Sequence, residues 1–458
     1  YYGWAGNSFI FSSEIKSFYK FPKFQKNISL DALSLFFKHC YIPSSYCIYK
    51  NIYKLESASF VKIDISSNNT ILNSINSQKY WTPEKNLNYE DLSNEELIEN
   101  IENKLQKSVK QQMRSDVPIG AFLSGGIDSS LVSLMMQKNS INKINTFNVS
   151  FNESQFDESP YARQVADTIG SNHHEIKLNH KMALDAIPAL GNIYDEPFSD
   201  SSQIPTFLIS KEIKKHVTVA LSGDGGDELF GGYNRYSSIN KVYNILKLLP
   251  YNSNAMLSNI IFSLNEKNWD ALNNIIFSKF SKNFLFSNFG HKMYRLGDRL
   301  KNCSNKMDLY KSFLSENYKN EIVVKNSNNI DIIDELVKKN NYEMSDFTNF
   351  MMFLDSKIYL PDDILVKVDR ASMSNSLESR SPFLDSDLVE FSYKIPSKYK
   401  IQKNNKKILL KKILNKYFDS NLFERPKAGF AIPLSQWLRG PLKSLLHDSI
   451  ANLKKNNQ

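Results

Sequence analysis

Two glycines, three serines and one aspartate stand together in residues 122–130 (FLSGGIDSS). Adjacent glycines allow backbone N–H groups to converge on an anion at a helix N-terminus, and serine hydroxyls add neutral donors. A bare phosphate would repel Asp128, so we expect Mg²⁺ to bridge this carboxylate to a polyphosphate. The run lacks the Gly-Lys-Ser/Thr ending of a Walker loop. It predicts a phosphate-binding loop with a metal ligand; the alternative is a serine- and glycine-rich turn with an aspartate as helix cap.

A second run with similar chemistry lies at residues 222–228 (SGDGGDE) and also follows a short apolar segment. Its three acids would repel one another unless a cation or a substrate ammonium offsets their charge. An EF-hand loop does not fit, because Gly226 would have to supply a ligand. An acidic surface turn is the plain alternative. We interpret the run as the second loop of one ligand site.

Strands and helices are expected to alternate around both loops. Ser93 and Glu96 form a capping-box pattern, and apolar residues then recur at every fourth position from Leu97 to Met113, which predicts an amphipathic helix. Another helix is expected from Ser159 to Gly170. The expected strands are residues 117–123, 144–151, 174–178 and 217–221. This alternation predicts a doubly wound α/β fold, in which helices cover both faces of a parallel sheet and ligands bind at the carboxyl ends of the strands.

Two further parts flank the predicted sheet. Residues 1–78 predict an incomplete β-rich module, and the pattern is mostly helical from about residue 240. The elements expected in the first part are a hairpin of residues 1–4 and 9–11, a helix at 30–37 and strands between 49 and 65. Because residue 1 already lies inside an expected strand, we expect the chain to be a fragment whose upstream strands are missing. The predicted division is into residues 1–78 and 79–458.

The composition suits a globular protein of two or three domains, with 458 residues of which 41% are hydrophobic and 23% charged. A net charge of +9 suggests a nucleic-acid partner, but the lysines are dispersed except between Lys394 and Lys416. We therefore expect an anionic nucleotide substrate and no nucleic acid. Three cysteines without a C-x-x-C pair argue against disulfides or zinc and favour a reducing cytoplasm. No apolar run is long enough to span a membrane, and no signal peptide is expected.

Five segments of the chain closely resemble the glutamine-hydrolysing asparagine synthetase family, in the family's order. The first loop by itself resembles the PP-loop of ATP pyrophosphatases, which cleave ATP to AMP and pyrophosphate. The five segments are residues 120–126 (GAFLSGG), 221–228 (LSGDGGDE), 369–373 (DRASM), 378–385 (ESRSPFLD) and 425–430 (RPKAGF). The resemblance covers essentially the whole chain. It implies that residues 1–78 are the C-terminal remnant of a class II glutamine amidotransferase domain, and that a PP-loop synthetase domain with a helical C-terminal part follows.

The family's site residues carry over onto the matching positions. The resemblance implies an adenine pocket at Leu123 and Val149, pyrophosphate contacts from Ser124, Gly125, Gly126, Asp128 and Ser129, Mg²⁺ ligands at Asp128 and Asp227, and nucleotide contacts from Ser222 and Gly223. Asp224 matches an acid that lies near the acyl adenylate and the incoming ammonia. Lys427 matches a lysine that stabilises charge on phosphate as bonds form and break.

Two arginines and the glutaminase nucleophile are the remaining site residues that the resemblance concerns. Arg370 and Arg380 lie in matched segments, and we expect them either to contact substrate or to form structural ion pairs with Asp369 and Glu378. None of the three cysteines can replace an N-terminal thiol whose own α-amino group acts as the base. We therefore expect no glutaminase nucleophile in this chain and no glutamine hydrolysis by it.

The resemblance implies a reaction in two steps. ATP with Mg²⁺ adenylates the side-chain carboxylate of aspartate, and ammonia, supplied from glutamine in the full-length protein, then displaces AMP to give asparagine. Residues 195–210 lack the arginine that holds aspartate in some members, and Asp224 stands where others have a longer glutamate. A paralogous amidotransferase that acts on another carboxylate, such as a surface-polysaccharide sugar acid, is therefore the closest alternative. A tRNA-modifying PP-loop enzyme and a non-catalytic scaffold fit less well, and a homodimer is one option for the oligomeric state.

Overall fold

The computed structural model describes residues 1–63, 77–83, 92–151, 153, 157–247, 253–277, 289–301, 303–316, 323–340, 345–423 and 434–455. Its central element is a parallel sheet of five strands in the order β10-β9-β6-β7-β8. The strands are β6 (Ile119–Phe122), β7 (Asn145–Phe151), β8 (Asn172–Leu178), β9 (Val219–Leu221) and β10 (Glu378–Arg380). The four strands expected from the sequence are confirmed. β10 was not expected, because its Glu-Ser-Arg sequence carries no apolar signal.

Helices cover both faces of this sheet, as the alternation predicted. One hydrophobic cluster contains side chains of α2 (Asn94–Gln112), α3 (Ile127–Lys138) and α4 (Ser159–Ile169), and a second contains side chains of α5 (His180–Ile193) and α6 (Gln203–Ile213). Successive side chains of a strand point to opposite faces. Accordingly, Val219 and Leu221 of β9 belong to the first cluster and Ala220 to the second.

The predicted helix boundaries are confirmed in detail. The Ser93 hydroxyl accepts a hydrogen bond from Glu96 N (3.2 Å), and the Glu96 carboxylate accepts one from Ser93 N (2.8 Å), which completes the capping box of α2. At the C-terminal end of α4, Gly170 has a φ of +74°, a left-handed conformation that suits glycine at a helix C-terminus. Local side-chain chemistry therefore places these helix ends.

The described residues of the N-terminal part form two small antiparallel sheets and one longer helix. The first sheet has the order β2-β1-β3, and β4 pairs with β5 in the second. The elements are β1 (Tyr2–Ala5), β2 (Ser8–Phe11), the 3₁₀-helix η1 (Ile15–Lys20), α1 (Leu30–His39), β3 (Ile52–Tyr53), β4 (Ser59–Val61) and β5 (Ser77–Lys79). The expected hairpin and helix are confirmed. The domain boundary near residue 78 stays a prediction.

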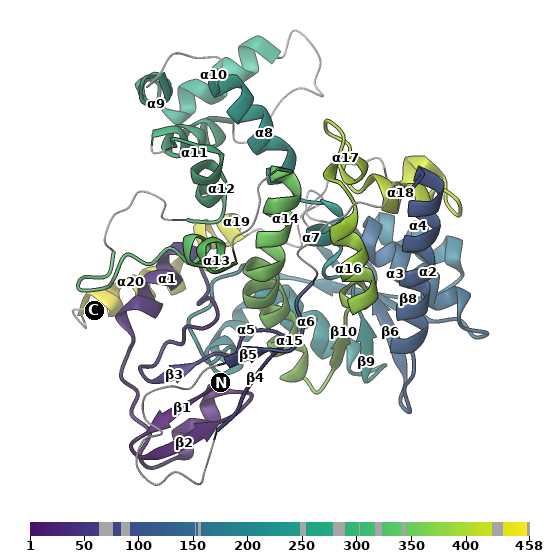
Figure 1. Cartoon of the computed structure of the whole chain (residues 1–458), viewed down its shortest axis with the longest axis horizontal. Helices are drawn as coiled ribbons and strands as arrows, with labels where there is room; N and C mark the ends of the chain where they lie inside the picture. Colours follow the sequence, from purple (N-terminus) through teal and green to yellow (C-terminus); the bar gives the residue numbers. More distant parts are fainter. Residues whose placement is uncertain are drawn as a thin grey trace.

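The chain after β9 is mainly helical, as expected. Its longer α-helices are α8 (Asn234–Lys247), α9 (Ser253–Ser263), α10 (Glu266–Phe277), α11 (Phe289–Lys301), α12 (Lys306–Phe313), α13 (Ile332–Asn340), α14 (Phe347–Lys357), α15 (Leu365–Met373), α16 (Ser386–Lys394), α18 (Ile408–Leu414) and α20 (Lys443–Lys455). Shorter pieces are α17 (Ser397–Lys400), α19 (Leu434–Arg439), the π-helix η4 (Leu360–Ile364) and the 3₁₀-helices η5 (Pro382–Leu384) and η6 (Ser420–Phe423). β1 and β2 lie at one end of the molecule, and α9, α10 and α11 lie at the other (Figure 1). Within the described ranges, no helix has both the length and the apolar character needed to cross a membrane.

Buried carboxylates attach the N-terminal part to the rest of the chain. The Glu196 side chain, 6% exposed, accepts hydrogen bonds from the Ile48 backbone N–H and the Tyr1 hydroxyl and lies 2.8 Å from Lys54 Nζ. Asp362 in η4 accepts hydrogen bonds from both the backbone N–H and the hydroxyl of Ser44. Buried charges are costly unless they are paired in this way. These contacts therefore fix the N-terminal part against the rest of the chain.

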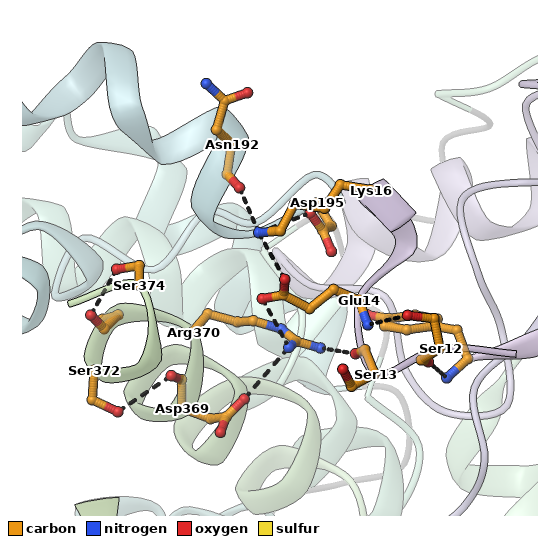
Figure 2. A network of polar contacts seen from close by, with 12 residues as sticks. Ser12, Ser13, Glu14, Lys16, Asn192, Asp195, Asp369, Arg370, Ser372 and Ser374 are labelled. Atoms are coloured by element: carbon orange, nitrogen blue, oxygen red, sulfur yellow. Dashed lines mark hydrogen bonds and ion pairs between the residues drawn. The ribbon is translucent and has the colours of Figure 1, made fainter. Parts of the chain in front are cut away.

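Arg370 of α15 belongs to the same junction (Figure 2). It donates a hydrogen bond to the Ser13 carbonyl (2.8 Å) and lies 3.4 Å from a carboxylate oxygen of Glu14. The other oxygen of Glu14 lies 3.1 Å from Lys16 Nζ, which also donates to the Asn192 carbonyl. The network joins three segments that are distant in sequence.

We expect Arg370→Met to lower the free energy of unfolding by about 1.5–3 kcal/mol, since hydrogen bonds to charged groups contribute on that order. The Arg370 side chain is only 13% exposed, so solvent screens this contact weakly. Arg163→Met is the matched control, because Arg163 pairs with Glu175 at the surface with 52% exposure, and its loss should cost less than about 1 kcal/mol. Urea unfolding of both variants gives the comparison. Equal losses of stability in the two variants would contradict the stabilising role of the Arg370 contacts.

Candidate active site

The first loop connects β6 to α3 at the carboxyl end of the sheet. Gly125 has a φ of +71°, and a Cβ there would lie 2.6 Å from Ala162 N, so only glycine fits without movement. The Gly126 N–H donates to the Ser124 hydroxyl, and the Ser124 N–H donates to the Ser129 hydroxyl. The predicted strand, loop and helix are all present. Their serines and backbone N–H groups gather at the N-terminus of α3, where a helix favours anions.

The second loop leads from β9 into the short helix α7 (Gly226–Phe230). β9 and β6 are parallel neighbours, so the loops that follow them meet at one edge of the sheet. A Cβ on Gly223 would lie 2.8 Å from Asp128 Cβ, and a Cβ on Gly226 would lie 2.5 Å from Asp128 Oδ1. The glycines of the second loop therefore allow close packing against the aspartate of the first.

We expect Gly223→Ala to lower the rate of the catalysed reaction by at least about tenfold, because its methyl group would displace Asp128 and a misplacement of about 1 Å can cost on the order of 100-fold. Gly191→Ala in α5 is the matched control. A Cβ at Gly191 meets nothing within 4 Å, so alanine should keep the rate and raise helix stability by about 0.5–1 kcal/mol. Steady-state rates and thermal unfolding test both variants, and unchanged kinetics in Gly223→Ala would contradict the close packing.

One lysine holds the two loops together. Lys407 Nζ forms an ion pair with Asp128 and lies 2.5 Å from Asp227 Oδ1. Burial lowers the pKa of Lys407, but the two carboxylates outweigh burial and raise that pKa above its ordinary value. Lys407 therefore stays charged. Sequence reasoning identified both aspartates and missed the lysine.

Asp224 and Glu228 complete the acidic group of the second loop. The Ser222 hydroxyl donates to Asp224 (2.8 Å), and burial raises the pKa of Asp224. The Tyr233 hydroxyl donates to Glu228 (2.6 Å), and burial together with the charge of Asp227 raises the pKa of Glu228 to about 7. The sequence predicted that the negative charges of the second loop need compensation. The structure supplies the ammonium of Lys407 and the hydroxyls of Ser222 and Tyr233.

A second charged cluster faces Asp224 and comes from the segment before α6, from η4 and from α15. Lys367 Nζ lies 2.6 Å from Asp200 Oδ2, and the charges of Lys367 and Asp224 act on each other's pKa. Burial and the nearby Asp200 raise the pKa of Asp363 to about 7. Sequence reasoning missed Lys367 as well. An available signal was its place in the polar stretch PDDILVKVDR (residues 361–370), which contains more charges than a covered helix normally carries.

The remaining predicted site residues have mixed outcomes. Leu123 and Val149 are both buried, but they belong to the hydrophobic clusters on opposite faces of the sheet, so a shared adenine pocket stays a prediction. Lys427 lies outside the described residues. The roles assigned to the first-loop serines and glycines also stay predictions.

The two arginines make the ion pairs that were one of their expected roles. Arg370 lies 3.6 Å from Asp369, and Arg380 Nε lies 2.6 Å from Glu378 Oε1. Arg380 also donates to the backbone carbonyls of Gln112 and Arg114 at the end of α2. Both guanidinium groups therefore join structural elements.

Two family models match this chain. A family model described as asparagine synthase matches residues 100–458, and one described as a glutamine amidotransferase domain matches residues 1–81. A putative glutamine-hydrolysing asparagine synthetase of Methanocaldococcus jannaschii is 43% identical over 237 residues, which are 51% of this chain and 44% of that protein. Asparagine synthetase 1 of Bacillus subtilis is 28% identical over 459 positions, with 98% of this chain and 66% of that protein covered.

A fungal relative is named for a different role. The amidase ChyE of Penicillium rubens is 23% identical over 404 positions, which cover 79% of this chain and 56% of that protein. The chain thus spans about half to two thirds of the length of these relatives. The asparagine synthase model covers well over half of the chain, in the part that holds both loops, Lys367 and Lys407. The chain therefore belongs to the asparagine synthase family.

Proposed function

We propose that this chain is the synthetase part of an ATP-dependent ligase, which adenylates the side-chain carboxylate of aspartate and transfers ammonia to it. The observation that carries the proposal is the meeting of two glycine-rich loops at neighbouring parallel strands, with Asp128 and Asp227 directed at one cation. Such an edge is where α/β sheets bind nucleotides. The family matches supply the class of reaction.

Mg²⁺ fits the donor set formed by Asp128 and Asp227. Mg²⁺ is usually bound by one or two carboxylates together with substrate phosphates. Asp128 and Asp227 supply two such carboxylates, one from each loop. When bound, the metal would offset triphosphate charge as the α-phosphorus is attacked.

The other residues of the site bind and orient the reactants. Backbone N–H groups and hydroxyls of the first loop would hold the departing pyrophosphate, because the loop leads directly into the N-terminus of α3, which favours anions. Asp224 would lie next to the acyl adenylate. Its raised pKa suits a group that accepts a proton from the attacking ammonia. Lys427 would stabilise phosphate charge, and Leu123 and Val149 would contact the adenine.

The match of residues 1–81 to a glutamine amidotransferase domain supports the proposal that glutamine supplies the ammonia in the whole protein. In this chain, ammonia itself would be the nitrogen donor. A second acceptor class has an observation in its favour: residues 195–210 contain no arginine, and Asp200 of this segment pairs with Lys367. An amidotransferase that acts on a carboxylate other than aspartate is therefore the competing proposal.

AMP formation from Mg-ATP and ammonium decides between these proposals when it is measured with a panel of carboxylates. The panel contains aspartate, glutamate, succinate and a uronic acid. We expect aspartate to be the only acid of the panel that gives AMP, and we expect asparagine to form in an equal amount. AMP formed only with another carboxylate would support the competing acceptor, and ADP in place of AMP would contradict adenylation.

A further inference from the structure

Lys407 reaches the two carboxylates from an unusual backbone position. It precedes the first turn of α18 with φ of 53° and ψ of 39°, a left-handed conformation that is uncommon for a residue with a long side chain. Such conformations persist where the surrounding structure requires them, and they cluster at functional sites. From this position the ammonium of Lys407 reaches both Asp128 and Asp227.

Gly232 provides the space that the lysine uses. A Cβ at Gly232 would overlap both Asp227 Oδ1 and Lys407 Cε. The Lys407 side chain is 5% exposed, and the two aspartate side chains are each 18% exposed. A glycine just after α7 thus leaves room for the same contact, and little solvent screens the charges.

The ammonium lies where a metal ion would need to bind. It contacts one oxygen of Asp128 and one of Asp227, and these are the two carboxylates that the proposed function assigns to Mg²⁺. Hard cations prefer such oxygen ligands. Two cations held by the same oxygens repel each other, so their binding is antagonistic.

We propose that Lys407 is a positioning residue which competes with Mg²⁺ for Asp128 and Asp227, so that the metal displaces its ammonium when it binds. The displaced ammonium stays beside the two loops, because the stem of Lys407 passes Gly232. The metal alone would bind weakly, and the metal with ATP would bind well. The identity of the competing metal rests on the proposed function.

Mn²⁺ binding without nucleotide tests this competition, because electron paramagnetic resonance measures free Mn²⁺ directly. Lys407→Met should bind one Mn²⁺ at least about tenfold more tightly than the parent protein, a difference of about 1.4 kcal/mol. Lys403→Met is the matched control, since Lys403 is an exposed lysine with a similar left-handed φ of 54°. It should bind Mn²⁺ as the parent does. Equal affinity in Lys407→Met and the parent would overturn the proposal.

A second comparison guards against misfolding, because loss of Lys407 leaves two buried carboxylates without their ammonium. Asp128→Asn and the double variant Asp128→Asn with Lys407→Met differ by the same lysine but leave only Asp227 to be compensated. The double variant should again bind Mn²⁺ more tightly, and equal or weaker binding would overturn the competition. These measurements contain no ATP and no carboxylic acid substrate. Failure of aspartate adenylation would therefore leave their result unchanged.

Discussion

Asp128→Asn is expected to lower the rate of AMP formation by about 10²–10³-fold, the usual effect of removing one preorganised electrostatic contact to the transition state. Asparagine keeps the size of the side chain, so packing against Gly223 and Gly226 is retained. It loses the charge that holds Lys407 and that we propose as a metal ligand. Pyrophosphate release at saturating Mg-ATP, ammonium and carboxylate substrate gives the rate.

Asp387→Asn is the matched control for this experiment. Asp387 pairs with Lys107 at the surface, where its side chain is 51% exposed. Solvent screens this exposed pair, and it lies outside the two loops, so the control should retain the parent rate within about twofold. A parent-like rate in Asp128→Asn would contradict the placement of Asp128 at the reacting phosphate. Thermal unfolding of each variant separates loss of chemistry from loss of structure.

Asp355→Ala is expected to have the largest effect on stability, a loss of about 3–5 kcal/mol. The side chain of Asp355 is fully buried and lies 2.7 Å from Arg235 Nη2. It also accepts hydrogen bonds from the hydroxyls of Tyr236 (2.5 Å) and Tyr310 (2.7 Å). Alanine would leave a buried guanidinium without this carboxylate and two buried hydroxyls without these acceptors, and such groups are expensive to bury alone.

Two further variants are compared with Asp355→Ala when stability is measured by urea unfolding. Asp355→Asn keeps an acceptor oxygen and should lose less stability than Asp355→Ala. Glu212→Ala removes a pair with Lys215 whose lysine side chain is 60% exposed, and the change should be below about 0.5 kcal/mol. A loss in Asp355→Ala no greater than that in Glu212→Ala would contradict the assigned network. Reduced stability with a normal rate per folded molecule would place the effect outside the chemistry.

Local sequence patterns were sufficient for the elements that surround the site. The capping box at Ser93, the glycine after α4 and the apolar strand runs each act within a few residues, so their structural effect can be predicted without knowledge of the fold. The Ser-Gly-Gly and Gly-Asp-Gly-Gly runs are equally local. Backbone freedom, hydroxyl donors and carboxylates in one turn already define the kind of ligand they suit.

β10 shows what local patterns could not supply. Its Glu-Ser-Arg sequence becomes a strand because Glu378 to Arg380 lie in register with Val219 to Leu221 of β9. Backbone hydrogen bonding to a neighbouring strand stabilises it, and no hydrophobic periodicity marks it. The same holds for Arg380, whose hydrogen bonds to carbonyls at the end of α2 exist only once β10 is in place.

By itself, the sequence determined the family, the parallel sheet and the presence of Asp128 and Asp227 in two glycine-rich loops. Only the tertiary structure decided which cation those acids share. Lys407 is 279 residues from Asp128 in sequence, and nothing in its Asn/Lys-rich surroundings sets it apart from the other lysines clustered between Lys394 and Lys416. Its role depends on the packing of α18 against α3 and α7 and on the space at Gly232, because electrostatic pairing is set by distance in space.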